Sequence, residues 1–248
     1  MTEQTQVLGR RVDRVTMIEA VDLIQQWLSD DGQAVQRLVI TANPEILMGA
    51  GADPYLAAAL DQADLVVADG IGVVWAAGQL GRPVPERVPG VELMGGILER
   101  AAAAGHRPYF LGTRPQIVAQ AVRTARGRYR GLEVAGWHHG YFGVEEEPAV
   151  LEKIRAAAPD LLFAGMGAAR ELKWLRLHQK ELGVPVCMGV GGSLDVLGGA
   201  AARAPLWIRR LHLEWFYRLL RDPARWRRQL VLPRFVLAVL AERFRGRR

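Results

Sequence analysis

Three apolar runs of the sequence end in residues that could carry out chemistry. Thr41 and Asn43 follow the first run, Asp69 follows the second, and a loop with Gly191 and Gly192 follows the third. A positioned carboxylate can remove the proton of an attacking hydroxyl group. The backbone N–H groups of a glycine loop can face a phosphate. These segments are therefore candidates for a site that combines a base with phosphate binding.

The same segments also have structural explanations, which the sequence leaves open. Asn43 and Asp69 are both of a type that often caps helices. The loop at 189–193 lacks a complete G-x-G-x-x-G spacing, because position 194 is Leu, so it could be a packing turn. The chain has no D-x-D triplet, which weakens any mechanism in which paired aspartates hold a metal on a nucleotide diphosphate.

The elements that must position these residues alternate along the chain. Short apolar runs bounded by turn residues predict strands at Leu38–Thr41, Leu65–Ala68, Pro108–Gly112, Leu132–Ala135, Leu161–Ala164 and Val184–Gly189. Apolar residues at helical spacing predict helices at Met17–Leu28, Pro54–Gln62, Ile71–Gln79, Val91–Ala104, Pro115–Arg128, Glu145–Ala157 and Arg170–Glu181. The alternation predicts an α/β fold with a Rossmann-like, mostly parallel sheet, whose ligands bind at the carboxyl ends of the strands.

Composition narrows the class of protein. The chain has 248 residues, of which 50% are hydrophobic and 23% charged, as in an ordinary globular protein with a sizeable core. A single cysteine, Cys187, excludes an internal disulfide framework and a cysteine-rich metal site. No apolar run reaches the length of a membrane span, and the first residues do not resemble a signal peptide. We therefore expect a reducing, cytoplasmic compartment.

The last part of the chain differs from the rest. Residues 203–248 hold thirteen arginines, no lysine and three acidic residues, a net charge of +10, so residues 1–202 carry −4. Seven of the eighteen aromatic residues also lie in 203–248. Interleaved arginine and aromatic side chains are typical of helices that lie at anionic membrane headgroups. We expect an α/β catalytic domain at 1–202, followed by a helical appendage at 203–248 that docks on the membrane and closes the site.

Taken together, these segments resemble one family, the WecG/TagA/CpsF glycosyltransferases. The resemblance spans nearly the whole chain and rests on TANPE at 41–45, ADGIGVVWAA at 68–77, RVPGVELM at 87–94, HHGYF at 138–142, GVGGSLDVLGG at 189–199, RAPLW at 203–207 and LEWFYRLLRDPARWRRQL at 213–230. It implies inverting transfer of a sugar from a UDP-sugar to a polyprenyl-diphosphate-linked sugar, with neither a metal nor a cofactor. Such enzymes build bacterial cell-surface polysaccharides on the inner face of the cell membrane, and familiar members add N-acetylmannosamine, its uronic acid or hexoses.

The resemblance also implies roles for particular residues. The aspartate of the family's D-G-I/V motif is its catalytic base and corresponds to Asp69, while Thr41 and Asn43 line the same pocket. The arginine of the R-V-x-G motif, here Arg87, also falls in the active site. Three arginines of the appendage match family positions that engage diphosphate when the tail folds over the pocket: Arg218, Arg225 and Arg228.

One motif departs from the family pattern. Where the family usually has G-x-P-x-Q-E-x-W, this chain has Gly167-Ala-Ala-Arg-Glu-Leu-Lys-Trp174, so Glu171 replaces a glutamine that lines the pocket. An amide can donate and accept hydrogen bonds, whereas an ionised carboxylate only accepts. The change puts the donor sugar in doubt, above all an N-acetylated or acidic one. Glu171 could equally be an ordinary residue on a helix surface.

Two other classes of function are weighed against this one. The basic, aromatic tail could bind nucleic acid, but the chain has no nucleic-acid-binding motif and its body is acidic, so we expect no nucleic-acid partner. A nucleotide-dependent oxidoreductase would share the sheet, but the incomplete glycine motif counts against it. The partners expected are a UDP-sugar, a polyprenyl-diphosphate-linked acceptor and an anionic membrane surface. A homo-oligomer is left open.

Overall fold

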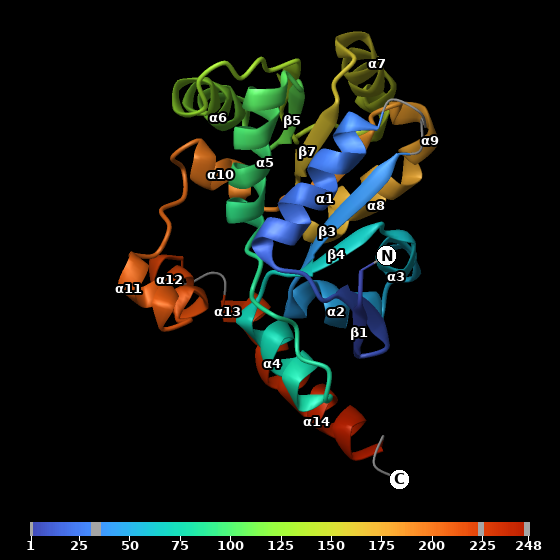
Figure 1. Cartoon of the computed structure of the whole chain (residues 1–248), viewed down its shortest axis with the longest axis vertical. Coiled ribbons are helices and arrows are strands. Elements are labelled where there is room, and N and C mark those ends of the chain that lie inside the picture. Colours follow the sequence, from blue (N-terminus) through green and yellow to red (C-terminus); the bar gives the residue numbers. More distant parts are fainter. Residues whose placement is uncertain (1, 31–35, 223–225, 246–248) are drawn as a thin grey trace.

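A six-stranded parallel sheet with helices on both faces forms the centre of the protein (Figure 1). The computed structural model describes residues 2–30, 36–222 and 226–245, and of residues 218, 227 and 228 it describes only the backbone. The strands lie in the order β4 (Leu65–Ala68), β3 (Arg37–Ala42), β8 (Val186–Gly189), β7 (Leu161–Gly165), β5 (Pro108–Gly112) and β6 (Gly136–His138). The predicted α/β class is confirmed.

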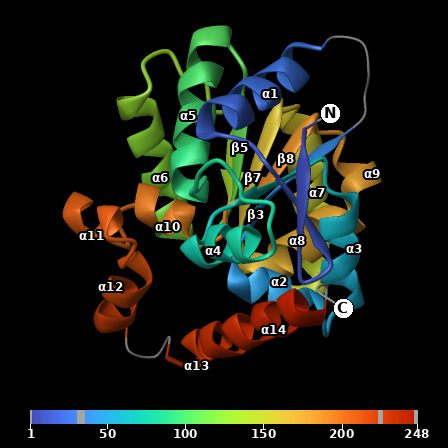
Figure 2. The same ribbon diagram turned by 60° about the horizontal axis from the view of Figure 1, so that its bottom comes forward.

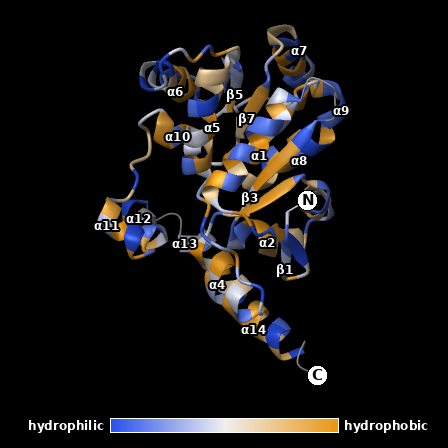
Figure 3. Ribbon diagram, in the orientation of Figure 1, coloured by the Kyte–Doolittle hydropathy of each residue, from blue (hydrophilic) through white to orange (hydrophobic). Residues whose placement is uncertain are grey.

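The strands other than β6 are buried on both faces, which explains why they are apolar almost throughout (Figure 3). Alternate residues belong to two hydrophobic clusters, one on each face; Leu38 and Ile40 belong to one, and Val39 to the other. One face is covered by α2 (Pro44–Ala50), α3 (Pro54–Gln62), α4 (Ile71–Gln79), α7 (Glu147–Ala157) and α8 (Ala168–Leu177). The other is covered by α1 (Met17–Ser29), α5 (Gly90–Ala104), α6 (Pro115–Arg128) and α10 (Ser193–Leu197).

One predicted strand is wrong in position. The apolar run at Leu132–Ala135 leads into the sixth strand but does not form it; the strand that pairs with β5 is β6, at Gly136–His138. Leu132 is 6% exposed and packs in the core from a turn, which gives the run its apolar character. β6 is a short edge strand that is only half buried, so it lacks the pattern that marks the inner strands.

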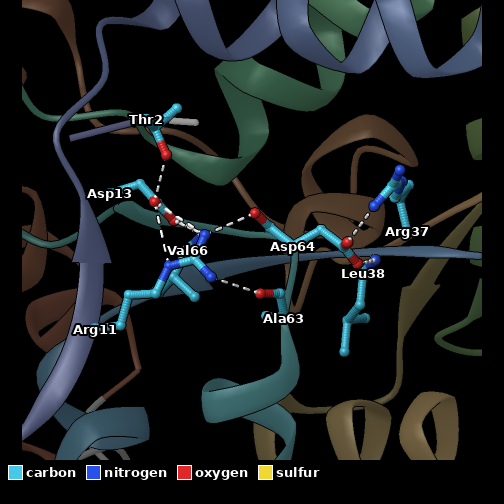
Figure 4. A network of polar contacts seen from close by, with 8 residues as sticks. All are labelled: Thr2, Arg11, Asp13, Arg37, Leu38, Ala63, Asp64 and Val66. Carbon is cyan, nitrogen blue, oxygen red and sulfur yellow. Dashed lines mark hydrogen bonds and ion pairs between the residues drawn. The ribbon is translucent and has the colours of Figure 1, made fainter. Parts of the chain in front are cut away.

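A hairpin that the sequence did not indicate, β1 (Gln4–Val7) and β2 (Arg10–Asp13), lies beside the edge strand β4. Figure 4 shows how polar side chains attach it. Asp13 is 1% exposed and accepts hydrogen bonds from the backbone N–H of Val66 at 2.7 Å and from Arg11. Arg11 in turn donates to the carbonyl oxygens of Ala63 and Asp64. The hairpin thus satisfies a backbone N–H of the edge strand β4 and the carbonyl groups just before it.

The last part of the chain forms α11 (Leu206–Arg210), α12 (Glu214–Arg221), α13 (Trp226–Gln229) and α14 (Val231–Arg245). Figure 2 shows α14 running beneath α2, while α11 and α12 lie to one side of the body. Phe235 and Val239 of α14 are at most 1% exposed and belong to the same hydrophobic cluster as α2 and α4. This packing differs from our expectation that residues from 203 onward lie outside the main core.

The remaining short helices are η1 (Val144–Glu146), which precedes α7 where one helix was expected, and α9 (Gln179–Leu182), which follows α8. The helix predicted at Arg170–Glu181 is divided into α8 and α9 at His178. The other predicted helices begin and end within two residues of the observed bounds. Proline occupies the first turn of α2, α3 and α6, where its missing N–H has no helical partner to lose. Local signals therefore account well for the helix starts.

Candidate active site

A cavity of about 740 Å³ opens at the carboxyl edge of the sheet. Its walls come from the loops after β3, β4, β5, β7 and β8 and from the helical appendage at 203–248, which we call the tail. Seven of the residues expected in the site line it together: Thr41, Asn43, Asp69, Arg87, Glu171, Gly191 and Gly192. The volume is in the usual range for a site that binds a small molecule.

The segment after β3 contributes both a cap and part of the cavity wall. Asn43 accepts a hydrogen bond at its Oδ1 from the backbone N–H of Ile46 at 3.0 Å, so it does cap α2. It also lines the cavity, which means that the two readings of Asn43 are compatible. Thr41 is 8% exposed, and its hydroxyl lies 3.5 Å from the carbonyl oxygen of Gly189 on the neighbouring strand.

Asp69 follows β4 directly, at the start of the turn into α4. Its backbone N–H donates to the carbonyl oxygen of Ala42 at 2.9 Å, which brings the ends of β3 and β4 together. A Cβ atom on Gly72 would lie 2.9 Å from the ring of Pro44, so the glycine permits this close approach. The two strand ends thereby place Asp69 and Asn43 at the same cavity.

Arg87 reaches the cavity from the loop before α5. The backbone N–H of the next residue, Val88, donates to the carbonyl oxygen of Ala68 at 2.8 Å, so this loop is bound to the strand end that carries Asp69. The guanidinium group of Arg87 donates to Glu214 of α12 at 2.9 Å. A buried ion pair thus joins the body to the tail inside the site.

The tail supplies one wall of the cavity through His212, Glu214, Trp215, Asp222, Gln229 and Leu232. Arg218 lies in α12 and Arg228 in α13, but their side chains are outside the described part of the structure. Arg225 lies outside the described residues altogether. Their expected contact with diphosphate therefore stays a prediction, while the elements that carry two of them border the cavity.

Glu171 is buried, at 2% exposure, so the interpretation as a helix-surface residue is wrong. One carboxylate oxygen accepts the backbone N–H of Gly191 at 2.9 Å, and the other accepts that of Met166 at 2.9 Å. Glu171 therefore connects the loops after β7 and β8. Since the N–H group of Gly191 is directed at this carboxylate, it is not directed at a phosphate in this structure.

Burial raises the pKa of Glu171 from 4.5 to about 7, against the opposing effect of its backbone hydrogen bonds. The folded chain thus holds a proton that the unfolded chain loses at lower pH. The stability linked to this proton is fully present below pH 4.5 and is lost as the pH rises through 7.

We predict that Glu171→Gln flattens the pH dependence of stability. Each tenfold change in proton affinity corresponds to about 1.4 kcal/mol, so ionisation of Glu171 should cost the wild type about 3 kcal/mol. Urea unfolding at several values between pH 4.5 and 8 would measure the difference. A lost hydrogen bond in the variant changes stability at every pH alike, so only the slope counts. Equal slopes for both proteins would contradict the prediction.

Sequence reasoning missed two polar residues on the far side of the cavity. Thr113 follows β5, and its hydroxyl donates to the carboxylate of Asp195 in α10. Both line the cavity. Thr113 stands at the carboxyl end of a predicted strand, so applying the strand-end rule to every strand would have identified it.

Among the residues that the structure describes, no three His, Cys, Asp or Glu side chains lie together as a metal site requires.

Comparison with known proteins adds to this geometry. The model of a family described as "Glycosyl transferase WecG/TagA/CpsF family" matches residues 5–248. An N-acetylglucosaminyldiphosphoundecaprenol N-acetyl-beta-D-mannosaminyltransferase of Bacillus spizizenii is 38% identical over 202 residues, which cover 82% of this chain and 78% of the relative. A protein of the same name from Staphylococcus aureus is 36% identical over 239 residues, covering 96% of this chain and 92% of the relative.

Proposed function

The chain belongs to the WecG/TagA/CpsF family of glycosyl transferases, and on this premise we propose that it transfers a sugar from a UDP-sugar to a polyprenyl-diphosphate-linked saccharide. The observation that carries the proposal is the single cavity in which seven expected residues from separate segments meet. The names of both relatives favour N-acetylmannosamine as the sugar and diphosphate-linked N-acetylglucosamine as the acceptor. The product would be a lipid-linked intermediate of a cell-surface polymer.

The environment of Glu171 bears on the donor sugar. Both of its oxygens accept backbone N–H groups, so the carboxylate that replaces the family's glutamine is engaged with the protein itself. Its effect is then on the position of two loops, and an N-acetylated donor is compatible with it. Together with the names of the relatives, this supports N-acetylmannosamine as the donor sugar.

We propose that the reaction is a single displacement with inversion at the anomeric carbon. The acceptor hydroxyl gives its proton to Asp69 and forms a bond to the anomeric carbon, while the bond from that carbon to UDP breaks. UDP leaves with the bonding electrons, and arginine side chains stabilise its charge. Arg87 lines the cavity that holds Asp69, and the tail arginines at 218, 225 and 228 are the further candidates for this role.

We predict that turnover is independent of divalent metal, because arginines take over the neutralisation of the diphosphate. Screening a panel of UDP-sugars for UDP release, with a short-chain polyprenyl-diphosphate-linked N-acetylglucosamine as acceptor, tests the function. The same assay in EDTA tests the metal. UDP-N-acetylmannosamine should be turned over at the same rate with and without EDTA. Loss of activity in EDTA that magnesium or manganese restores would contradict metal independence, and no release from any UDP-sugar would contradict the function.

The tail also presents apolar side chains to the solvent. Leu206, Trp207 and Leu211 are 62%, 63% and 58% exposed, and Leu220 is 66% exposed. No helix within the described residues is both long and apolar enough to cross a membrane. Exposed aromatic and leucine side chains in a segment of charge +10 suit a peripheral contact with anionic headgroups. We propose that this face of α11 and α12 docks on the membrane that holds the acceptor.

We predict that Trp207→Glu with Leu211→Glu weakens sedimentation with anionic vesicles at least about tenfold, because burial of a single leucine already stabilises by about 1.5–3 kcal/mol. The matched control places the same charges on exposed apolar residues of the body, Val144→Glu with Leu177→Glu, which are 80% and 69% exposed. The control should bind vesicles like the wild type. Equal losses in both double variants would mean that charge alone matters and that α11 and α12 are no docking face.

A further inference from the structure

Burial along α12 is the reverse of the usual pattern. Glu214, a charged residue, is 7% exposed, whereas its neighbours Trp215 and Phe216 are 41% and 44% exposed. A carboxylate loses its hydration when it is buried, and this costs free energy unless a partner compensates. The burial of Glu214 therefore calls for partners that compensate its charge.

One such partner is Arg87, on the cavity wall. The Nη2 atom of Arg87 lies 2.9 Å from Oε2 of Glu214, and the two side chains are 16% and 9% exposed. The Nε atom of Arg87 is buried and has no hydrogen-bond acceptor among the described residues. One edge of the guanidinium group is thus held by the tail, while a donor remains that no described protein group satisfies.

A second group of ion pairs between the tail and the body lies outside the cavity. Glu92 of α5 accepts hydrogen bonds from Arg203 at 2.7 Å and from Arg209 at 3.0 Å. The Glu92 side chain is 41% exposed, so solvent screens these pairs and each contributes little to stability. Loss of the buried Arg87–Glu214 pair should matter far more, because it leaves an uncompensated charge inside the site.

We propose that Glu214 is a positioning residue for sugar transfer: docking of α12 brings its carboxylate against Arg87 and fixes the guanidinium group at the cavity. The proposal rests on the proposed function. It explains why the tail brings an acid, rather than only arginines, into a site for an anionic substrate. Without Glu214, Arg87 lacks its described partner, and the tail and the site are no longer linked through it.

The test uses three variants of the full-length chain and two readouts. Glu214→Ala removes the carboxylate, whereas Glu214→Gln removes the charge but keeps an oxygen that can accept a hydrogen bond. Glu92→Ala is the matched control, because it removes the ion pairs with Arg203 and Arg209 outside the cavity. The readouts are kcat and KM for UDP release from UDP-N-acetylmannosamine, and hydrogen exchange of the α12 amides. We expect kcat to fall about 10- to 100-fold in Glu214→Ala, as misplacement of a binding group by about 1 Å can cause. Glu214→Gln should recover part of this loss, and Glu92→Ala should stay near the wild type.

Hydrogen exchange separates this proposal from the proposed function. α12 should exchange faster in Glu214→Ala than in Glu92→Ala, whatever the substrate proves to be. Exchanging the charges, Arg87→Glu with Glu214→Arg, should restore slow exchange in α12 but not turnover, because Arg87 belongs to the site. Wild-type kcat and unchanged exchange in Glu214→Ala would overturn the proposal. Equal losses of kcat in Glu214→Ala and Glu92→Ala would also overturn it, because any ion pair that holds the tail would then have the same effect on turnover.

Discussion

Replacing Asp69 with Asn should lower turnover by roughly two to four orders of magnitude, which is the usual contribution of a positioned base. Asn has nearly the same size, but it cannot take the proton of the acceptor hydroxyl. The N-cap of α4 is Gly70, without a side-chain cap, so the helix start does not depend on the carboxylate of Asp69. Asp69 lines the cavity with Asn43 and Arg87, and its backbone is bound to the end of β3. The fold should therefore survive the change, and the loss should appear in kcat.

The control for this prediction is Asp61→Asn, which removes a carboxylate that pairs with Arg10 on the surface, away from the cavity lining. Circular dichroism should show both variants folded, and UDP release should separate them. If the folded Asp69→Asn protein turns over within a few-fold of the Asp61→Asn protein, then Asp69 is not the base and another group takes the proton.

The second large effect is on stability. Phe235→Ala should destabilise the protein by about 3–5 kcal/mol, because the ring is 1% exposed between α14 and the body and its removal leaves a cavity. Phe244→Ala in the same helix is the matched control, since that ring is 63% exposed and the expected change is within about 0.5 kcal/mol. Urea unfolding of both variants measures the difference, and similar midpoints for both would show that α14 is not part of the core.

Because α14 packs in the core, removing the whole tail affects both the core and the site. A truncation near Ala202 removes Phe235 and Val239 from the hydrophobic cluster that covers one face of the sheet. Such a fragment should unfold more easily than the full chain, so a loss of activity would not isolate the role of α11 and α12. Substitutions on the exposed face of these helices leave α14 in place and are the sharper experiment.

The sheet and the strand-end residues were predictable because their signals are local. Buried parallel strands are short apolar runs, and the residues that follow them must share one edge of the sheet. Thr41, Asn43 and Asp69 were found in this way, and the family motifs added Arg87. The edge strand β6 and the hairpin before α1 escaped because edge elements are half exposed and lack a continuous apolar run.

The roles of Glu171 and Glu214 could not be predicted, for a different reason. A glutamate in a helix is ordinarily exposed, and only partners outside its helix decide otherwise. For Glu171 they are backbone groups of two loops, and for Glu214 the partner is Arg87, 127 positions away in the chain. Burial of Phe235 likewise depends on where α14 packs, which no pattern within residues 203–248 specifies.

The most direct test of the account is the mass of the lipid product. The full-length protein would be incubated with UDP-N-acetylmannosamine and a short-chain polyprenyl-diphosphate-linked N-acetylglucosamine, and the lipid measured by mass spectrometry. If the chain is this transferase, the lipid gains one N-acetylhexosamine residue for each UDP released. UDP release without a gain in lipid mass, or an unchanged lipid with every UDP-sugar tried, would contradict it.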